Sequence, residues 1–76
     1  MKVAVTGITG SLGQALTRSF LSDPSVTRLV GISRDEQKQS HMASQFGAHP
    51  ALRLFLGDIR DERRLVQAFR GCDTVV

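Results

Sequence analysis

The sequence predicts an α/β fold built on a parallel sheet, and three observations carry this prediction. Short apolar runs alternate with segments of helical periodicity along all 76 residues. The apolar runs are nearly continuous, which is typical of strands that are buried on both faces of a sheet. The first run leads straight into three evenly spaced glycines, Gly7, Gly10 and Gly13. Alternating strands and helices imply parallel pairing with right-handed crossovers.

The first strand is expected at residues 2–6, and a helix is expected at residues 11–22. The helix is predicted from an apolar stripe that recurs at helical spacing. Pro24 ends it, because a proline disfavours helix in the residue before it and cannot donate a backbone hydrogen bond. The members of the stripe are Leu12, Ala15, Leu16 and Phe20.

The second strand is expected at residues 28–32, and a second helix runs from there to residue 46. Ser33 and Glu36 have the spacing of a capping box, in which each side chain bonds the backbone N–H of the other residue. Met42 and Phe46 are expected to face inward, and Gly47 is a typical helix stop.

The third strand is expected at residues 52–56, where Arg53 suits an exposed edge position. Either Asp58 or Asp61 begins a third helix that runs to residue 70 and stops at Gly71. The apolar residues of this helix are Leu65, Val66 and Phe69. Residues 73–76 open a fourth strand.

These elements follow the pattern β-α-β-α-β-α-β, and the usual strand order for it is 3-2-1-4. In that order the first two helices cover one face of the sheet and the third helix covers the other. We expect residues 1–76 to form the first half of a Rossmann-type doubly wound parallel sheet, the N-terminal part of an NAD(P)-binding domain. The fold is then truncated, and a substrate domain is absent.

Composition excludes several classes of protein. The net charge is +3, but basic residues are interspersed with acidic ones and there is no Trp or Tyr to stack on bases, so nucleic acid is not an expected partner. The lone Cys72 excludes an internal disulfide and fits a reducing compartment, so we expect a cytoplasmic protein. The first apolar run is far shorter than a signal or membrane span.

The glycine segment predicts a phosphate site. Gly7 permits a sharp turn off the strand, Gly10 leaves room for a pyrophosphate, and Gly13 allows the helix to pack close to the strand. The free N–H groups and the positive dipole end of the helix then face the anion. Thr9, Ser11 and Leu12 offer further backbone N–H or hydroxyl donors on the same loop.

The end of the second strand distinguishes between the two nicotinamide cofactors. An NAD site has Asp or Glu about 20 residues past the glycines, where the carboxylate binds the ribose 2′-hydroxyl. That position is Ser33, followed by Arg34, and Lys38 lies one helical turn further on. These side chains would bind a 2′-phosphate, so NADP is expected over NAD. A capping serine beside surface charges is the alternative, and Asp35 keeps NAD open.

The pattern Thr6-Gly7-x-x-Gly10-x-x-Gly13 resembles the extended short-chain dehydrogenase/reductase superfamily. Three further segments resemble the nucleotide-sugar 4,6-dehydratases and epimerases of polysaccharide biosynthesis, which act on UDP-N-acetylglucosamine. They are Ser-Arg-Asp-Glu-Gln-Lys-Gln at residues 33–39, Arg-Leu-Phe-Leu-Gly-Asp-Ile-Arg-Asp at residues 53–61, and Gly-Cys-Asp-Thr-Val-Val at residues 71–76. The resemblance covers essentially the whole chain, which corresponds to the family's N-terminal quarter.

The resemblance implies roles for Asp58 and Ile59, which follow the third strand at the sheet edge where ligands bind. The matching Asp of the family contacts the adenine amino group, and the next residue lies against the ring. A helix N-cap is the alternative role for Asp58. The family transfers hydride with a Tyr-x-x-x-Lys pair, and this chain contains no tyrosine, so no catalytic residue is expected in it.

The remaining reactive residues are expected to be structural. His41 and His49 lack metal-ligand spacing with each other or with Cys72, so no metal site is expected. Cys72 is expected to be a half-buried thiol. Four arginines are expected on the solvent side of the third helix: Arg60, Arg63, Arg64 and Arg70.

The sequence thus predicts the NADP-binding portion of a nucleotide-sugar 4,6-dehydratase or epimerase, a possible homo-oligomer that is not catalytic as this chain alone. Two alternatives stay open: a non-catalytic dinucleotide-sensing or interaction module of the short-chain dehydrogenase/reductase type, and a degenerate product without a biochemical role. The predicted cofactor-binding residues are Gly7, Thr9, Gly10, Ser11, Leu12, Gly13, Ser33, Arg34, Lys38, Asp58 and Ile59.

Overall fold

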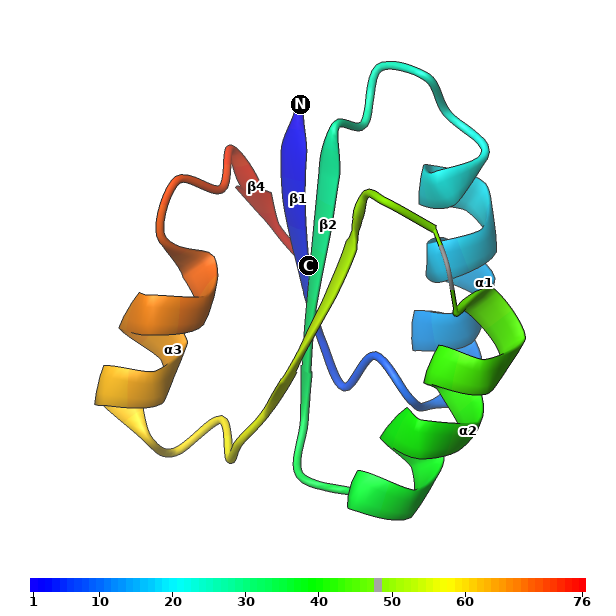
Figure 1. Ribbon diagram of the computed structural model, residues 1–76. Helices are drawn as coiled ribbons and strands as arrows, with labels where there is room; N and C mark the ends of the chain where they lie inside the picture. Colours follow the sequence, from blue (N-terminus) through cyan, green and yellow to red (C-terminus); the bar gives the residue numbers. More distant parts are fainter. Residues whose placement is uncertain (48) are drawn as a thin grey trace.

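The computed structural model describes residues 1–47 and 49–76, and in these it has four strands and three helices (Figure 1). The strands pair in parallel in the order β3-β2-β1-β4, which confirms the predicted α/β class and strand order. Along the chain the elements are β1 (Lys2–Thr6), α1 (Ser11–Leu21), β2 (Arg28–Ser33), α2 (Glu36–Phe46), β3 (Leu52–Leu56), α3 (Glu62–Phe69) and β4 (Thr74–Val75).

The strand register aligns the carboxyl ends of the three longer strands. Thr6 at the end of β1 pairs with Ile32 in β2, and Ser33 at the end of β2 pairs with Leu56 in β3. The loops that leave these three strands therefore emerge side by side at one edge of the sheet. In Figure 1 this edge points downward.

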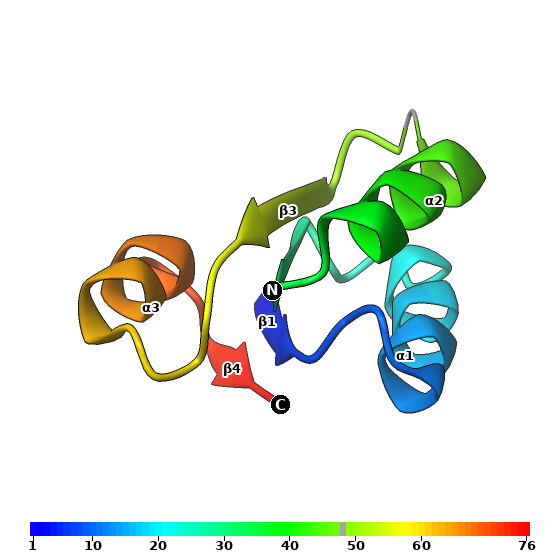
Figure 2. The ribbon, with the colours of Figure 1, turned by 90° about the horizontal axis from the view of Figure 1, so that it is seen from below.

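The helices form two unequal layers on the sheet, as predicted. Figures 1 and 2 show α1 and α2 on one face and α3 alone on the other. Side chains alternate along β1, so that Val3 and Val5 face the α1–α2 side while Ala4 faces α3. On the α1–α2 side the buried core consists of Val3, Val5, Ile8, Val26, Leu29 and Met42, and on the α3 side of Ala4, Val30, Ile32 and Ala68.

The predicted inner stripe of α1 is wrong for two of its members. Leu12 is 70% exposed, and Ala15 is exposed as well. Gly13 and Thr17 face the sheet instead, with Leu16 and Phe20 partly buried beside them. The reason is close packing at Gly13, where an added Cβ would lie 2.5 Å from the backbone oxygens of Gly7 and Ile8. The helix turns its smallest residue inward, and the Thr17 hydroxyl is satisfied by the Gly13 carbonyl at 2.7 Å.

The predicted capping box at α2 is also wrong. Ser33 remains in β2, where its carbonyl accepts from the Gly57 N–H at 2.9 Å. The cap is Asp35, whose Oδ1 accepts from the Lys38 N–H at 3.0 Å. Pairing with β3 extends the strand by one residue beyond the prediction, and this moves the helix start. Gly47 ends α2, as predicted.

Asp61, not Asp58, caps α3 by accepting from the Arg64 N–H at 3.2 Å. Ala68 supplies the buried contact of this helix, and Val66 is exposed. Arg53 lies exposed on the edge strand β3, as predicted. Within the described ranges, no helix is both long and apolar enough to span a membrane.

Candidate functional site

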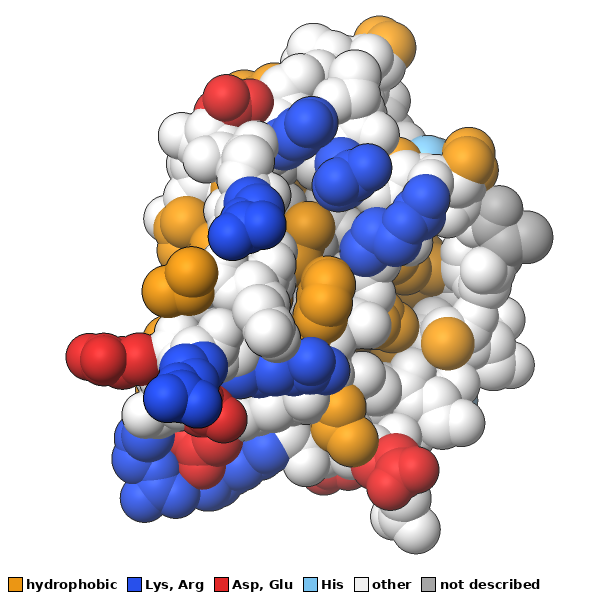
Figure 3. Space-filling view, turned by 60° about the vertical axis from the view of Figure 1, so that its left-hand side comes forward, with side chains coloured by type: hydrophobic (Ala, Val, Ile, Leu, Met, Phe, Trp, Pro, Cys, Tyr) orange, Lys and Arg blue, Asp and Glu red, His pale blue; other side chains and the backbone are white. Residues whose placement is uncertain are grey.

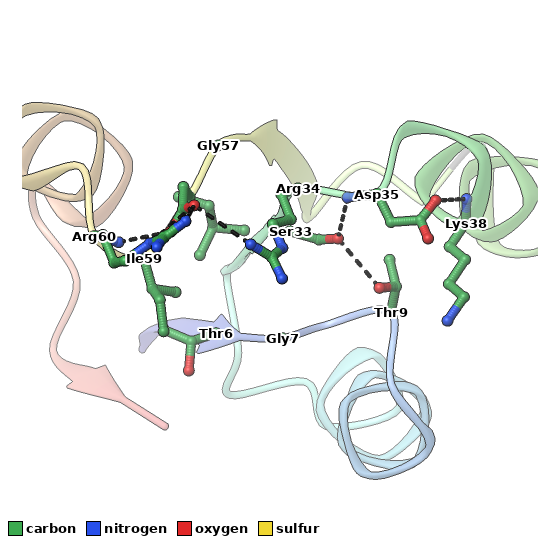
Figure 4. Close-up of a pocket in the computed structure, with 12 residues that line it drawn as sticks. Thr6, Gly7, Thr9, Ser33, Arg34, Asp35, Lys38, Gly57, Ile59 and Arg60 are labelled. Atoms are coloured by element: carbon green, nitrogen blue, oxygen red, sulfur yellow. Dashed lines mark hydrogen bonds and ion pairs between the residues drawn. The ribbon is translucent and has the colours of Figure 1, made fainter.

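A hollow of about 620 Å³ lies at the carboxyl ends of β1, β2 and β3. Figure 4 shows the loops after these strands contributing its walls. Seven of the eleven predicted site residues line it together with the last residues of the strands. The lining residues are Thr6, Gly7, Thr9, Ile32, Ser33, Arg34, Asp35, Lys38, Gly57, Asp58, Ile59 and Arg60.

Two smaller hollows flank the glycine loop and take in the other predicted residues. One, of about 410 Å³, is lined by Gly10 and Ser11 together with Lys38 and His41. The other, of about 360 Å³, includes Leu12 and Gly13 among its lining residues. Lys38 therefore borders both the first hollow and the second one. The glycine loop lies where the hollows meet.

The glycine loop has the geometry of an anion cradle. Gly7 adopts φ +61°, a backbone conformation that side-chain-bearing residues rarely take, and its carbonyl accepts from the Gly10 N–H at 3.0 Å. Helix α1 begins at Ser11 after Gly10, and no side chain caps its first turn. No acidic residue lies in that turn either. Its leading N–H groups are therefore available to a phosphate, and the positive end of the helix dipole favours one.

The Ser33 hydroxyl already has hydrogen-bond partners within the protein, which limits how it can bind a phosphate. It is only 8% exposed, and its Oγ accepts from the Asp35 N–H at 3.1 Å. The Thr9 hydroxyl lies 3.1 Å from the same oxygen. A serine hydroxyl has one hydrogen, so Ser33 can donate to a ligand only when Thr9 donates to Ser33. Figure 4 shows this Thr9–Ser33 link joining the glycine loop to the end of β2.

Two cations flank the Thr9–Ser33 link. In Figure 4 the Arg34 guanidinium extends on one side of it and the Lys38 ammonium on the other. Arg34 is largely free, with 75% of its side chain exposed. Asp35 also borders the hollow, and one of its carboxylate oxygens already bonds the Lys38 backbone.

Asp58 forms an ion cluster with two arginines. Arg60 Nη2 bonds Asp58 Oδ2 at 2.8 Å, and Arg60 Nε bonds Oδ1 at 3.2 Å. Arg34 Nη1 lies 3.6 Å from Oδ2. The hydrogen bonds from the Arg60 side chain and backbone hold the pKa of the Asp58 carboxyl well below its usual value, and the same side-chain bond raises the pKa of Arg60. Asp58 is thus a fixed carboxylate at the rim of the hollow.

Ile59 follows Asp58 in the sequence, lines the same hollow and is 61% exposed. An apolar side chain at the rim of a hollow offers a flat ligand a dry contact surface. Figure 3, in which the carboxyl ends of the strands still point downward, shows basic side chains beside acidic ones at the lower end of the molecule, with hydrophobic side chains close by.

Five lining residues are absent from the predicted cofactor-binding set: Thr6, Ile32, Asp35, Gly57 and Arg60. Arg60 differs most from its prediction, since it was expected on the solvent side of α3. It precedes α3, and its guanidinium turns back to Asp58. Arg64 was also expected in solvent; it is partly buried, 5.3 Å from the Phe55 ring centroid, and its Nε donates to the Leu56 carbonyl. The contact between Arg60 and Asp58 had one signal in the sequence: an Asp that lies two residues before an Arg at the end of a strand.

The two histidines and the cysteine lie where they were predicted. His41 and His49 are exposed, and His49 Nδ1 accepts from the Ala51 N–H. Cys72 is partly buried, and this burial raises the pKa of its thiol. Among the described residues, no group of three His, Cys, Asp or Glu side chains has the geometry of a metal site.

Together, a glycine turn between β1 and α1, a 3-2-1-4 parallel sheet and a ligand-sized hollow at its carboxyl edge define the class of Rossmann-type α/β folds. Comparison with known proteins identifies the family. Residues 3–76 match the family of polysaccharide biosynthesis proteins, and the chain belongs to this family.

Several relatives are nucleotide-sugar enzymes. The chain is 43% identical over 74 residues to a UDP-N-acetylglucosamine 4,6-dehydratase (inverting) of Campylobacter jejuni, and the match covers 97% of this chain and 22% of the relative. It is 36% identical to a UDP-glucose 4-epimerase of Rickettsia akari, covering 93% of this chain and 21% of the relative. The chain thus spans about a fifth of the length of these curated relatives.

Solved structures show the same fold. The structure of Pen from Bacillus thuringiensis superposes with a TM-score of 0.90 at 27% identity, covering 97% of this chain and 22% of that one. A variant of UDP-glucuronic acid 4-epimerase from Bacillus cereus, in complex with a fluorinated UDP-glucuronic acid and NAD, has a TM-score of 0.80 at 21% identity. That match covers 99% of this chain and 25% of the other.

Proposed function

We propose that residues 1–76 are the NADP-binding N-terminal portion of a nucleotide-sugar 4,6-dehydratase or epimerase that acts on UDP-N-acetylglucosamine in polysaccharide or glycan biosynthesis. The observation that carries the proposal is the single hollow that joins the glycine loop to Arg34, Lys38 and Asp58. The named relatives supply the reaction class, because the dehydratase of Campylobacter jejuni is 43% identical.

The glycine loop is proposed to hold the pyrophosphate of the cofactor. The uncapped N–H groups at the start of α1 suit an anion. Gly10 lies on the same loop, and an added Cβ there would lie 3.4 Å from the Gly7 carbonyl oxygen. Asp58 and Ile59 are proposed to receive the adenine, one through a carboxylate oxygen and the other through its exposed apolar side chain.

The cations at the end of β2 favour NADP over NAD. Arg34 and Lys38 both border the hollow, and Ser33 stands where an NAD site has a carboxylate. An exposed guanidinium can bind a phosphate through two parallel hydrogen bonds, and NAD lacks the 2′-phosphate that would accept them. Asp35 is the acidic residue closest in sequence to Ser33, but one of its carboxylate oxygens caps α2.

A bound nicotinamide cofactor supplies the hydride acceptor for the sugar chemistry. These 76 residues contain no tyrosine, so the proposal assigns them cofactor binding and no proton transfer. The single cysteine, Cys72, fits the reducing cytoplasm that the proposal assumes.

The test is calorimetric titration of the chain with NADP and, separately, with NAD. We expect saturable binding that favours NADP. Arg34→Ala should weaken NADP binding about tenfold, the size of a charge-assisted hydrogen bond, and change NAD binding little. Arg63→Ala removes the same charge from an exposed position on α3 and is the matched control. Equal affinities for the two cofactors, or equal effects of the two variants, would contradict the proposal.

A further inference from the structure

We propose that Arg60 is a positioning residue that sets the preference for NADP over NAD. It does so by occupying the Asp58 carboxylate, which leaves the Arg34 guanidinium available to a ligand phosphate. The inference rests on the proposed function. It concerns a side chain that would touch neither the 2′-phosphate nor the reacting atoms.

Arg60 donates to both oxygens of the Asp58 carboxylate through its backbone N–H, Nε and Nη2. Oδ1 accepts from the Arg60 backbone N–H at 2.9 Å and from Nε at 3.2 Å. Oδ2 accepts from Nη2 at 2.8 Å, and it shares the single Nε hydrogen with Oδ1, at 3.3 Å from Nε. Arg34 Nη1, at 3.6 Å from Oδ2, is beyond hydrogen-bond distance. The carboxylate charge is therefore neutralised in the first place by Arg60.

The Asp58–Arg60 pair has a conformational advantage over the Asp58–Arg34 pair. Its members are two residues apart in one turn, which is closed by the Asp61 N–H bond to the Asp58 carbonyl at 2.9 Å. Arg34 comes from the end of β2 and must be held across the hollow. Ordering a long side chain costs rotamer entropy, and a locally tethered pair loses less of it.

Without Arg60, the nearest cation to Asp58 is Arg34. A movement from 3.6 Å to about 2.8 Å would turn their contact into a charge-assisted hydrogen bond. Arg34 would then have to leave a carboxylate before it could bind a phosphate. This competition weakens NADP binding and leaves NAD binding nearly unchanged, because NAD has no 2′-phosphate.

If the Arg60 charge acted directly on the ligand, its removal would also lower the affinity for NADP. A double-mutant cycle separates this explanation from the positioning role. In an Asp58→Asn background there is no carboxylate for Arg60 to hold or for Arg34 to be drawn to. Loss of Arg60 should then have no further effect on selectivity if it acts through Asp58, whereas a direct charge effect would persist. Asparagine keeps the side-chain oxygen that bonds the backbone of residue 60.

The experiment is calorimetric titration of four proteins with NADP and with NAD: the wild type, Arg60→Ala, Asp58→Asn and the double variant. The measured quantity is the ratio of the two dissociation constants, in which any shared adenine contact cancels. We expect Arg60→Ala to lower the preference for NADP about fivefold, the size of an ordinary exposed ion pair. The double variant should stay within about twofold of Asp58→Asn.

A ligand-free measurement tests the same contact. In Arg60→Ala the NMR signals of the Arg34 guanidinium should shift as it pairs with Asp58, and in the double variant they should return to the position seen in Asp58→Asn. Arg63→Ala should shift neither these signals nor the selectivity ratio.

The outcomes separate the inference from the proposed function. If the wild type prefers NADP and Arg60→Ala keeps that preference, the positioning role is overturned and the proposed function stands. An equal loss in both backgrounds overturns it too, in favour of a direct charge effect. A wild type without any preference for NADP overturns the proposed function, and the inference with it.

Discussion

Gly13 sets how closely α1 approaches the sheet. An added Cβ would lie 2.5 Å from two backbone oxygens, those of Gly7 and Ile8, and backbone atoms cannot rotate out of the way. The helix would have to move away from β1, and Thr17 and Ile8 would lose their packing.

We therefore expect Gly13→Ala to lower the free energy of unfolding by about 2 to 3 kcal/mol, as for an overpacked core. Urea denaturation followed by circular dichroism measures the loss. Gly10→Ala is the matched control, because its Cβ would meet only the Gly7 carbonyl oxygen, at 3.4 Å. The control should lose much less stability, and equal losses would mean that contact at Gly13 does not limit the approach of the helix.

Ser33 shows how one residue can satisfy two sequence patterns. Its spacing to Glu36 is that of a capping box, and its position is also that of a ribose-contacting residue. In the structure its hydroxyl belongs to the contact with Thr9 and Asp35, and Asp35 caps the helix. Asp35 has the same capping chemistry, so the local pattern alone did not decide between them.

At the scale of elements, Gln39 ties α2 to the carboxyl ends of two strands. Its buried side-chain amide donates to the Ser33 carbonyl at 3.0 Å and to the Phe55 carbonyl at 2.7 Å. It thereby anchors the end of β2, from which Arg34 projects, against the edge strand β3. Ser33 also accepts from the Gly57 N–H.

Gln39→Leu should destabilise the protein by about 1 to 2 kcal/mol, because the Phe55 carbonyl loses this donor. Gln45→Leu, at an exposed position of the same helix, is the control for the change in side chain. Urea denaturation compares the two variants. An equal stability for both would mean that water replaces the lost donor at the sheet edge.

Across the whole molecule, the free energy of local opening is expected to vary, because the two helical layers bury unequal cores. The α1–α2 side buries six core residues and the α3 side four. Helix α3 has eight residues, and β4 has two exposed ones. Regions with few buried contacts open at lower free energy than the central strands.

Native-state hydrogen exchange should therefore show the slowest amides in β1 and β2, such as Val5 and Val30, and markedly faster ones in α3. The comparison uses free energies of opening, which correct for the intrinsic exchange rate of each amide. If α3 amides were as protected as those of β2, the two layers would unfold as one cooperative unit.

Most of the fold could be predicted because its signals are local. The apolar runs predicted all four strands, and the glycine turn with alternating strands and helices predicted the sheet order. The same reasoning placed Gly7, Arg34 and Asp58 at one edge, since parallel strands end together. Strand and helix periods and turn residues are properties of neighbouring residues, and the sequence contains them in full.

Contacts between distant segments were decided by the tertiary structure alone. Close packing of Gly13 against Gly7 and Ile8 rotated α1 and exposed Leu12. The turn after β3 brought Arg60 back onto Asp58, and Arg34 arrived from another strand. Such contacts depend on distances of a few ångströms between segments that come together only when the chain folds. Sequence patterns therefore determined the architecture, and three-dimensional packing determined which side chains are partners within the site.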